Sequence, residues 1–333
     1  PSRPAVACYA RRDARAPAAP GPPMKTLDDL HVGDTFRDIR ACDRLRPVYY
    51  AAASGDFNPL HLDPEVARGA GLGSNILQGM CTFTWLADVC TAYLDDPGRL
   101  RRIAARFTRP VCPGDVLAFD GRCAAVTADA VRLEVTVTNQ RGEEVLSGAW
   151  AEGSVHPGAP RSPALPAGRI TAGAPAGDPR IGRRYGPYRY EVGLEHVREF
   201  AIVAAGGVPA RSFGAMPAAP PPHPFFVSEE AGRRSPYGSV IAPPTFAAAL
   251  AVQPCAEAFT DPANGFDVLR VLHGDEDLAI HAIVRPGDVL ETAGEITRVE
   301  RKERFEVVTL RCVAANQRGE AVLETSSSWI VRR

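Results

Sequence analysis

Apolar and polar residues alternate in two regions of the chain, and each region follows a longer apolar segment. The alternation covers residues 131–150 and 305–329, and period-two patterning broken by Gly-containing turns predicts antiparallel hairpins. The longer segments, 76–94 and 243–259, are apolar on nearly every face, which predicts buried helices. Pro254 is expected to kink or end the second helix, which Pro244 can start.

Two pentapeptides occur twice in the same order, which indicates an internal duplication. PGDVL lies at 113–117 and 286–290, and NQRGE lies at 139–143 and 316–320. Pro-Gly-Asp between strands is typical of a structural turn, so neither PGDVL motif is expected to be catalytic. One buried helix before antiparallel strands, present twice, predicts an α+β fold with a long sheet wrapped around central helices.

Composition divides the chain further. Residues 153–180 are rich in Pro, Gly and Ala, as in linkers. We therefore expect one domain over 24–155, a linker over 156–178 and a second domain over 179–333. Residues 1–23 are basic and Pro/Ala-rich without an apolar core, so a disordered tail is expected there rather than a secretory signal.

Charge and cysteine usage narrow the function classes. The formal net charge is −1, so no overall field favours nucleic acid or an anionic membrane. No apolar run approaches the ~20 residues of a membrane helix. Eight cysteines are scattered without metal-ligand spacing, which predicts no metal site and a reducing, cytoplasmic location.

The stretch SGDFNPLHLD, residues 54–63, carries the candidate chemistry. A short helix is expected over Tyr49–Ala53, and the Asn-Pro step after it restricts the backbone. This rigid crossing holds Asp56 and His61 in a fixed relation. A carboxylate and an imidazole that share one water can act as general base and general acid. The alternative is that Asp56 forms an Asx turn and His61 is a structural histidine.

YAAASGDFNPLHLD, AGLGSNILQGMCTFTWL and RFTRPVCPGDVL together resemble the MaoC-like family of (R)-specific enoyl-CoA hydratases and 3-hydroxyacyl-thioester dehydratases. The resemblance implies a double hot-dog fold, in which two antiparallel sheets, each around a central helix, pair into one. It also implies that Asp56 and His61 form the catalytic dyad, and that Asn58 orients the loop or the dyad. The backbone N–H of Gly79 would stabilise the enolate oxygen. Gln78 stands where the family often has histidine, so the role of that side chain is open.

Further contacts follow from the same resemblance. Gln78, Met80 and Phe57 are expected to bind substrate. The arginine-rich run at 99–109 could meet coenzyme A phosphates, or it could form a solvated face. No metal or redox cofactor is implied, because coenzyme A or an acyl-carrier protein is part of the thioester substrate.

The second half resembles the non-catalytic hot-dog unit of two-part family members. No Asp-x4-His pair occurs in its corresponding loop. We expect His223 to face solvent and His196 to lie on a surface helix. His273 and His281 are expected in strand regions without a suitably placed carboxylate. One active site per chain is therefore predicted, with the second half shaping the acyl tunnel. In two-domain members the active unit usually comes second, whereas here it comes first, so no particular substrate can be transferred.

The sequence thus predicts reversible hydration of a trans-2-enoyl thioester to the (R)-3-hydroxyacyl thioester. Two alternatives remain: an acyl-CoA thioesterase, and a non-enzymatic acyl-thioester-binding or accessory subunit. Pairing of the two halves within the chain is expected, and a homodimer is possible.

Overall fold

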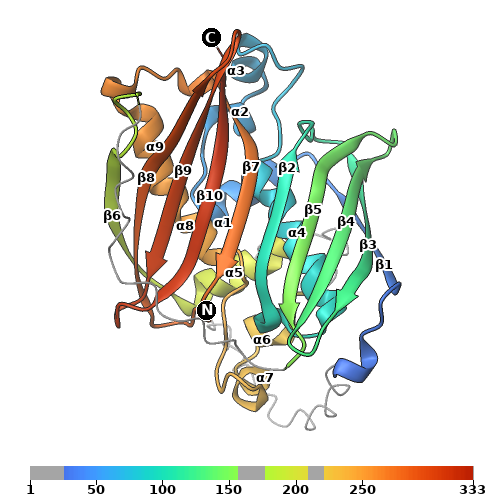
Figure 1. The fold of residues 1–333 in the computed structure, drawn as a ribbon. Coiled ribbons are helices and arrows are strands. Elements are labelled where there is room, and N and C mark those ends of the chain that lie inside the picture. Colours follow the sequence, from blue (N-terminus) through green and yellow to red (C-terminus); the bar gives the residue numbers. More distant parts are fainter. Residues whose placement is uncertain (1–25, 157–176, 209–220, 333) are drawn as a thin grey trace, which may run out of the picture.

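The computed structural model describes residues 26–156, 177–208 and 221–332. Within them a ten-stranded antiparallel sheet has the order β1-β3-β4-β5-β2-β7-β10-β9-β8-β6 (Figure 1). The tail expected over 1–23, most of the expected linker and most of the Pro-rich insertion at 215–224 lie outside the described residues. The sheet curves around the helices, and the α+β double hot-dog architecture is confirmed.

Each half contributes five adjacent strands to the described sheet and places its helices on the concave side (Figure 1). The first half contains β1 (Thr35–Ala41), α1 (Arg46–Ser54), α2 (Pro59–Leu62), α3 (Pro64–Gly69), α4 (Gly79–Leu94), β2 (Leu100–Phe107), β3 (Val116–Val126), β4 (Ala130–Asn139) and β5 (Glu144–Ser154). The second contains β6 (Arg184–Glu191), α5 (Leu194–Ala204), α6 (Pro224–Val227), α7 (Glu229–Arg234), α8 (Phe246–Leu250), α9 (Val252–Thr260), β7 (Val271–Ile280), β8 (Val289–Arg301), β9 (Phe305–Ala315) and β10 (Ala321–Arg332). Short 3-10 turns occur at Leu27–Asp29, Pro97–Arg99, Pro262–Asn264 and Val268–Arg270.

The two halves join where β2 pairs with β7. Main-chain pairing runs from Arg102 opposite Ala279 to Arg106 opposite Asp275. On the outer face Arg102 forms a two-pronged ion pair with Asp277. The two five-stranded units are therefore one continuous sheet, as the resemblance implied.

The central helices of the two halves differ. α4 is continuous and almost entirely buried. The helix of the second half is broken at Ala251, between α8 and α9. Pro254 explains the break, because it has no N–H to donate to the carbonyl of Leu250 four residues earlier. The predicted kink is confirmed, although α8 begins at Phe246, two residues after Pro244.

The repeated pentapeptides contact each other within each half. Asp115 of the first PGDVL accepts a hydrogen bond from Gln140 of the first NQRGE at 2.8 Å. Asp288 and Gln317 repeat this bond at 3.1 Å. In each half the two motifs therefore connect two turns at one end of the strands, in agreement with a structural role.

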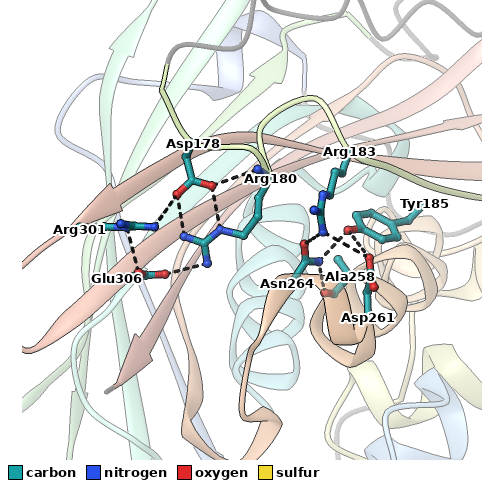
Figure 2. Close-up of polar contacts among 9 residues, drawn as sticks. All are labelled: Asp178, Arg180, Arg183, Tyr185, Ala258, Asp261, Asn264, Arg301 and Glu306. Atoms are coloured by element: carbon teal, nitrogen blue, oxygen red, sulfur yellow. Dashed lines mark hydrogen bonds and ion pairs between the residues drawn. The ribbon is translucent and has the colours of Figure 1, made fainter.

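A polar network ties the start of the second half to its sheet and helix (Figure 2). Arg180 donates to Asp178 and to Glu306 on β9, each at 2.9 Å. These bonds to Arg180 lower the pKa of Asp178 to about 2. Nearby, Asn264 donates to the Tyr185 hydroxyl at 2.7 Å, so β6 is also fixed against the turn that follows α9.

Two further observations concern the described residues alone. No helix among them is both long and apolar enough to cross a membrane. They also contain no group of three or more His, Cys, Asp or Glu side chains placed to hold a metal ion.

Candidate active site

The end of α1 fixes the position of Asp56. The helix stops at Ser54 because Gly55 adopts the left-handed conformation, with φ of +79°, which glycine enters without steric cost. The Ser54 hydroxyl donates to the Tyr50 carbonyl at 2.7 Å and accepts from the backbone N–H of Asp56 at 3.2 Å. The expected short helix is confirmed, and it begins three residues earlier than expected, at Arg46.

Asn58 then starts the four-residue helix α2, which carries His61. Its side-chain oxygen accepts from the backbone N–H of Leu60 at 3.0 Å, as an N-cap. The carboxylate of Asp56 accepts from the backbone N–H of Asn58 at 3.3 Å. This geometry agrees with an orienting role for Asn58, whose importance for activity stays a prediction.

Asp56 and His61 are brought together. Nε2 of His61 lies 3.6 Å from Oδ2 of Asp56, and their side chains are 13% and 22% exposed. This separation is too long for a direct hydrogen bond, but it allows both atoms to contact one water molecule. Nδ1 of His61 lies 2.9 Å from the carbonyl oxygen of Ile76. Because a carbonyl only accepts, Nδ1 carries the proton and Nε2 presents a lone pair towards Asp56.

Two side-chain amides, of Gln78 and Asn75, bind the backbone of the loop that carries Asp56 and His61. Gln78 is 1% exposed and donates to the carbonyls of Pro47 and Asp56, at 3.0 and 3.2 Å. Asn75 donates to the carbonyl of His61 at 2.9 Å. Sequence reasoning missed Asn75, which no local pattern marks. The structure gives Gln78 a loop-holding position, and its contact with substrate stays a prediction.

Gly79 is the first residue of α4. A backbone N–H at this position has no acceptor within the helix, and the helix N-terminus adds positive partial charge. A Cβ atom here would lie 3.2 Å from the Phe107 ring. The absence of a side chain therefore lets this ring pack closely against the start of α4.

A cavity of about 30 Å³ extends from Asp56 into the second half. Tyr50 and Met80 line its first-half side, and residues of α8, α9, β7 and β10 line the opposite side. Met80 is thus where a substrate-binding residue was expected. Phe57 is 59% exposed and is not among the residues that line this cavity, so its substrate contact also stays a prediction.

The arginine-rich run is largely committed to structure. Arg99 is fully buried and donates to the carbonyls of Ser154 and Val155. Arg102 and Arg106 pair with aspartates across the β2–β7 joint. The structure therefore gives no support to coenzyme A phosphate binding by these three arginines.

The second half contains the same loop path with different residues. The N–H of Ile76 donates to the Leu60 carbonyl in the first half, and the N–H of Ile241 donates to the Phe225 carbonyl in the second. α2 and α6 have equal lengths and each starts with proline. These matches make Ile241 the counterpart of Ile76 and Phe225 that of Leu60.

Counting from these anchors shows what replaces each proposed functional group. Pro221 stands at the position of Asp56, Phe226 at that of His61, and Pro244 at that of Gly79. Proline has no N–H, so even the backbone donor is missing. His223 takes the place of Asn58 and, like it, caps its helix, through a 3.2 Å bond from the Phe225 N–H.

The expectations for His223 and His273 are wrong, and His196, which does lie on the partly exposed helix α5, makes contacts that were not expected. His223 is half-buried against two phenylalanines rather than solvent-facing, and burial lowers its pKa to about 4. His196 is half-buried, with Nε2 2.7 Å from the Ala53 carbonyl and Nδ1 bonded to the Tyr190 hydroxyl. His273 does have a carboxylate partner, because Glu276 lies 3.0 Å away.

Comparisons with known proteins agree with this geometry. The profile of the MaoC like domain matches residues 34–145, and that of the FAS1-like, dehydratase domain region matches 180–325. The chain belongs to the MaoC-like dehydratase family.

Curated relatives cover parts of the chain. A UPF0336 protein of Streptomyces avermitilis is 33% identical over 153 residues, which are 46% of this chain and 92% of that protein. The "Probable enoyl-CoA hydratase 2" of Dictyostelium discoideum is 43% identical over 106 residues, 31% of this chain and 35% of that protein.

Solved structures match over nearly the whole chain. A MaoC domain protein from Chloroflexus aurantiacus has a TM-score of 0.66 at 15% identity, covering 95% of this chain and 100% of its own. A conserved Mycobacterium tuberculosis protein, described as a double hotdog fold, has a TM-score of 0.65 at 14% identity, covering 93% and 99%. At these identities the likeness concerns the fold alone.

Proposed function

We propose that this chain reversibly adds water to a trans-2-enoyl thioester to give the (R)-3-hydroxyacyl thioester. The observation that carries the proposal is the 3.6 Å separation of Asp56 and His61 beside a cavity that reaches into the second half. Membership of a dehydratase family and similarity to an enoyl-CoA hydratase 2 support the same reaction type.

The tautomer of His61 suggests the roles. A water between the two side chains donates one hydrogen to Asp56, and Nε2 of His61 removes the other as the oxygen attacks C3. The electrons move onto the thioester oxygen, where the N–H of Gly79 stabilises the negative charge. The imidazolium, stabilised by the Asp56 carboxylate, then returns the proton to C2. One water is consumed, and both residues recover their starting states.

The substrate is a thioester of coenzyme A or of an acyl-carrier protein, and we expect no separate cofactor. A cytoplasmic location remains our expectation.

The experiment is a loss-of-absorbance assay of enoyl-CoAs with Asp56→Asn and His61→Ala variants. General acid–base assistance contributes roughly 10²–10⁴ in rate, so each variant should lose at least about two decades of kcat. Asp63→Asn is the matched control, because Asp63 only caps α3 by accepting from the N–H of Glu65. Near-wild-type turnover by both folded dyad variants would refute the proposal, and release of free thiol would instead indicate a thioesterase.

A further inference from the structure

A buried carboxylate lies in the wall of the cavity that contains Asp56. Glu276, on β7, is only 3% exposed. Its Oε2 atom accepts a hydrogen bond from the Ser327 hydroxyl at 2.5 Å and lies 3.0 Å from Nε2 of His273. All three side chains line the same cavity as Asp56, although the proposed reaction uses none of them.

The hot-dog fold itself does not require polar residues at these positions. The 173-residue offset between the two PGDVL motifs maps Ile103 onto Glu276. Ile103 pairs with Ala151 across β2 and β5, just as Glu276 pairs with Ser327 across β7 and β10. Ile103 and Ala151 are fully buried and apolar. Burying a carboxylate is costly, so its presence in the second half points to a purpose other than packing.

A second observation comes from Trp329 on β10. Its ring stacks on His273 with the centroids 4.2 Å apart, and it lines the cavity. Its indole nitrogen is buried and has no hydrogen-bond partner among the described residues. The indole N–H only donates, so this donor lacks the acceptor that buried polar groups normally have.

The opposite wall is built to leave room. Ala248, Ala249 and Ala251 of the broken central helix line this side of the cavity. By the register of the loop, these alanines stand where α4 of the first half has the buried residues Phe83, Thr84 and Leu86, each of which is larger. The small residues of the second half keep a space of about 30 Å³ open, which suits a small chemical group.

The chemistry of the wall selects among possible occupants. A carboxylate accepts more hydrogen bonds than the two that Glu276 receives, whereas the indole N–H needs an acceptor. A hydroxyl both donates and accepts, so its chemistry matches both groups. An ammonium group only donates, and an alkyl end does neither, which would leave buried polar groups unpaired.

Building on the proposed hydratase function, we propose that Glu276, Ser327 and Trp329 form a recognition site for a hydroxyl group on the acyl chain. The substrate class is then a 2-enoyl thioester hydroxylated away from the double bond, rather than a plain alkyl one. His273 is a positioning residue, because it holds Glu276 and stacks on Trp329.

The test compares substrates that differ only in this hydroxyl: trans-2-hexenoyl-CoA with its 6-hydroxy form, and trans-2-octenoyl-CoA with its 8-hydroxy form. Sites built to bind a substrate hydroxyl discriminate strongly against analogues that lack it. We expect kcat/KM to favour one hydroxylated member by at least about tenfold. Glu276→Leu should remove this preference, and Glu276→Gln should reduce it. Asp277→Asn is the control. Asp277 is the next residue on β7, but it pairs with Arg102 and is not among the residues that line the cavity.

Binding separates the site from the reaction. Calorimetric titration of hexanoyl-CoA and octanoyl-CoA against their terminally hydroxylated forms measures the same preference without turnover. A preference in binding that Glu276→Leu abolishes supports the site even if the chain hydrates nothing. Equal affinity for both members at both lengths, or an unchanged ratio in folded Glu276→Leu, overturns it. If that variant does not fold, Glu276→Gln and Ser327→Ala decide by the same ratio.

Discussion

His61 illustrates how one backbone contact decides what a side chain can do. The Ile76 carbonyl, 2.9 Å from Nδ1, fixes the proton on that nitrogen. Nε2 is thereby left as the acceptor that faces Asp56. The contact comes from the segment that leads directly into α4, so the same stretch of chain, residues 76–79, orients the imidazole and carries the Gly79 N–H. The proposed base and the proposed oxyanion donor are therefore positioned by neighbouring residues.

At Gly79 we predict that the addition of one methyl group will lower activity. In Gly79→Ala the new Cβ would lie 3.2 Å from the Phe107 ring, which must shift by a few tenths of an ångström, and the methyl group would stand beside the N–H. A misplacement near 1 Å can cost about 10²-fold in rate, so kcat/KM should fall ten- to a hundredfold. The free energy of unfolding should change by less than about 1 kcal/mol.

The control is Gly73→Ala, whose new Cβ would meet no atom within 4 Å and whose φ is not positive. It should leave both enoyl-CoA turnover and urea unfolding unchanged. Wild-type kcat/KM in Gly79→Ala would contradict the role given to this N–H.

At the scale of elements, α2 and α6 are equivalent four-residue helices that differ in their N-cap residues. Asn58 caps one and His223 caps the other, each accepting from the N–H two residues later. If Nδ1 of His223 were protonated, it could no longer accept this hydrogen bond and would face the N–H as a second donor. Burial also disfavours the charged imidazolium, and it lowers the pKa of His223 to about 4.

We predict that this cap makes stability depend on pH. The unfolded histidine has a pKa near 6.5, so between about pH 6.5 and 4 the unfolded state binds more protons than the folded state. Stability from His223 is therefore complete above that window and declines as pH falls through it. Between pH 7.5 and 5.0 the loss should be about 2 kcal/mol.

In His223→Asn the N-cap of α6 becomes asparagine, as at Asn58 in the first half. Asparagine does not titrate, so this part of the pH dependence of the unfolding free energy should disappear. Urea unfolding of both proteins at the two pH values measures it. Parallel losses in wild type and variant would show that His223 titrates normally in the folded state.

Local sequence patterns predicted the helices and strands well, but they predicted the contacts between these elements less well. The central helices, the Pro254 break and the hairpins followed from periodicity and proline chemistry. The proximity of Asp56 and His61 was predictable because only five residues and a rigid Asn-Pro step separate them. The Glu276–Ser327 pair was not, since it depends on the register of β7 against β10, fifty-one residues apart and interrupted by a bulge. The burial of His196 likewise depends on contact with the other half.

For the whole molecule, the two halves exchange reciprocal contacts besides sharing the sheet. Arg46 on α1 donates to the carbonyls of Gly206 and Gly207, just after α5, at 2.6 and 2.5 Å. His196 on α5 contacts the Ala53 carbonyl at the end of α1. Each first helix thus steadies the end of the other, and the end of α1 is where Asp56 is positioned.

We therefore predict that Arg46→Ala will weaken both stability and activity. The side chain is 4% exposed and also pairs with Asp43, which is 34% exposed, so its loss leaves three part-buried acceptors without this donor. Losing these bonds should cost about 1–3 kcal/mol, measurable by urea unfolding. Turnover should fall as well, because the end of α1 loosens. Arg44→Ala, at an exposed position, is the control, and equal stability of the two variants would contradict this account.

The replacements at Pro221, Phe226 and Pro244 have a consequence for the history of the chain. Regaining the first-half set there would require at least Pro221→Asp, Phe226→His and Pro244→Gly together, and none of these restores a working set alone. A second equivalent site would therefore not arise by any one of these substitutions. The cavity wall of the second half, in contrast, can be changed while every group of the proposed dyad stays in place. Substitutions in that wall are therefore the ones expected to alter substrate choice without altering the proposed reacting groups.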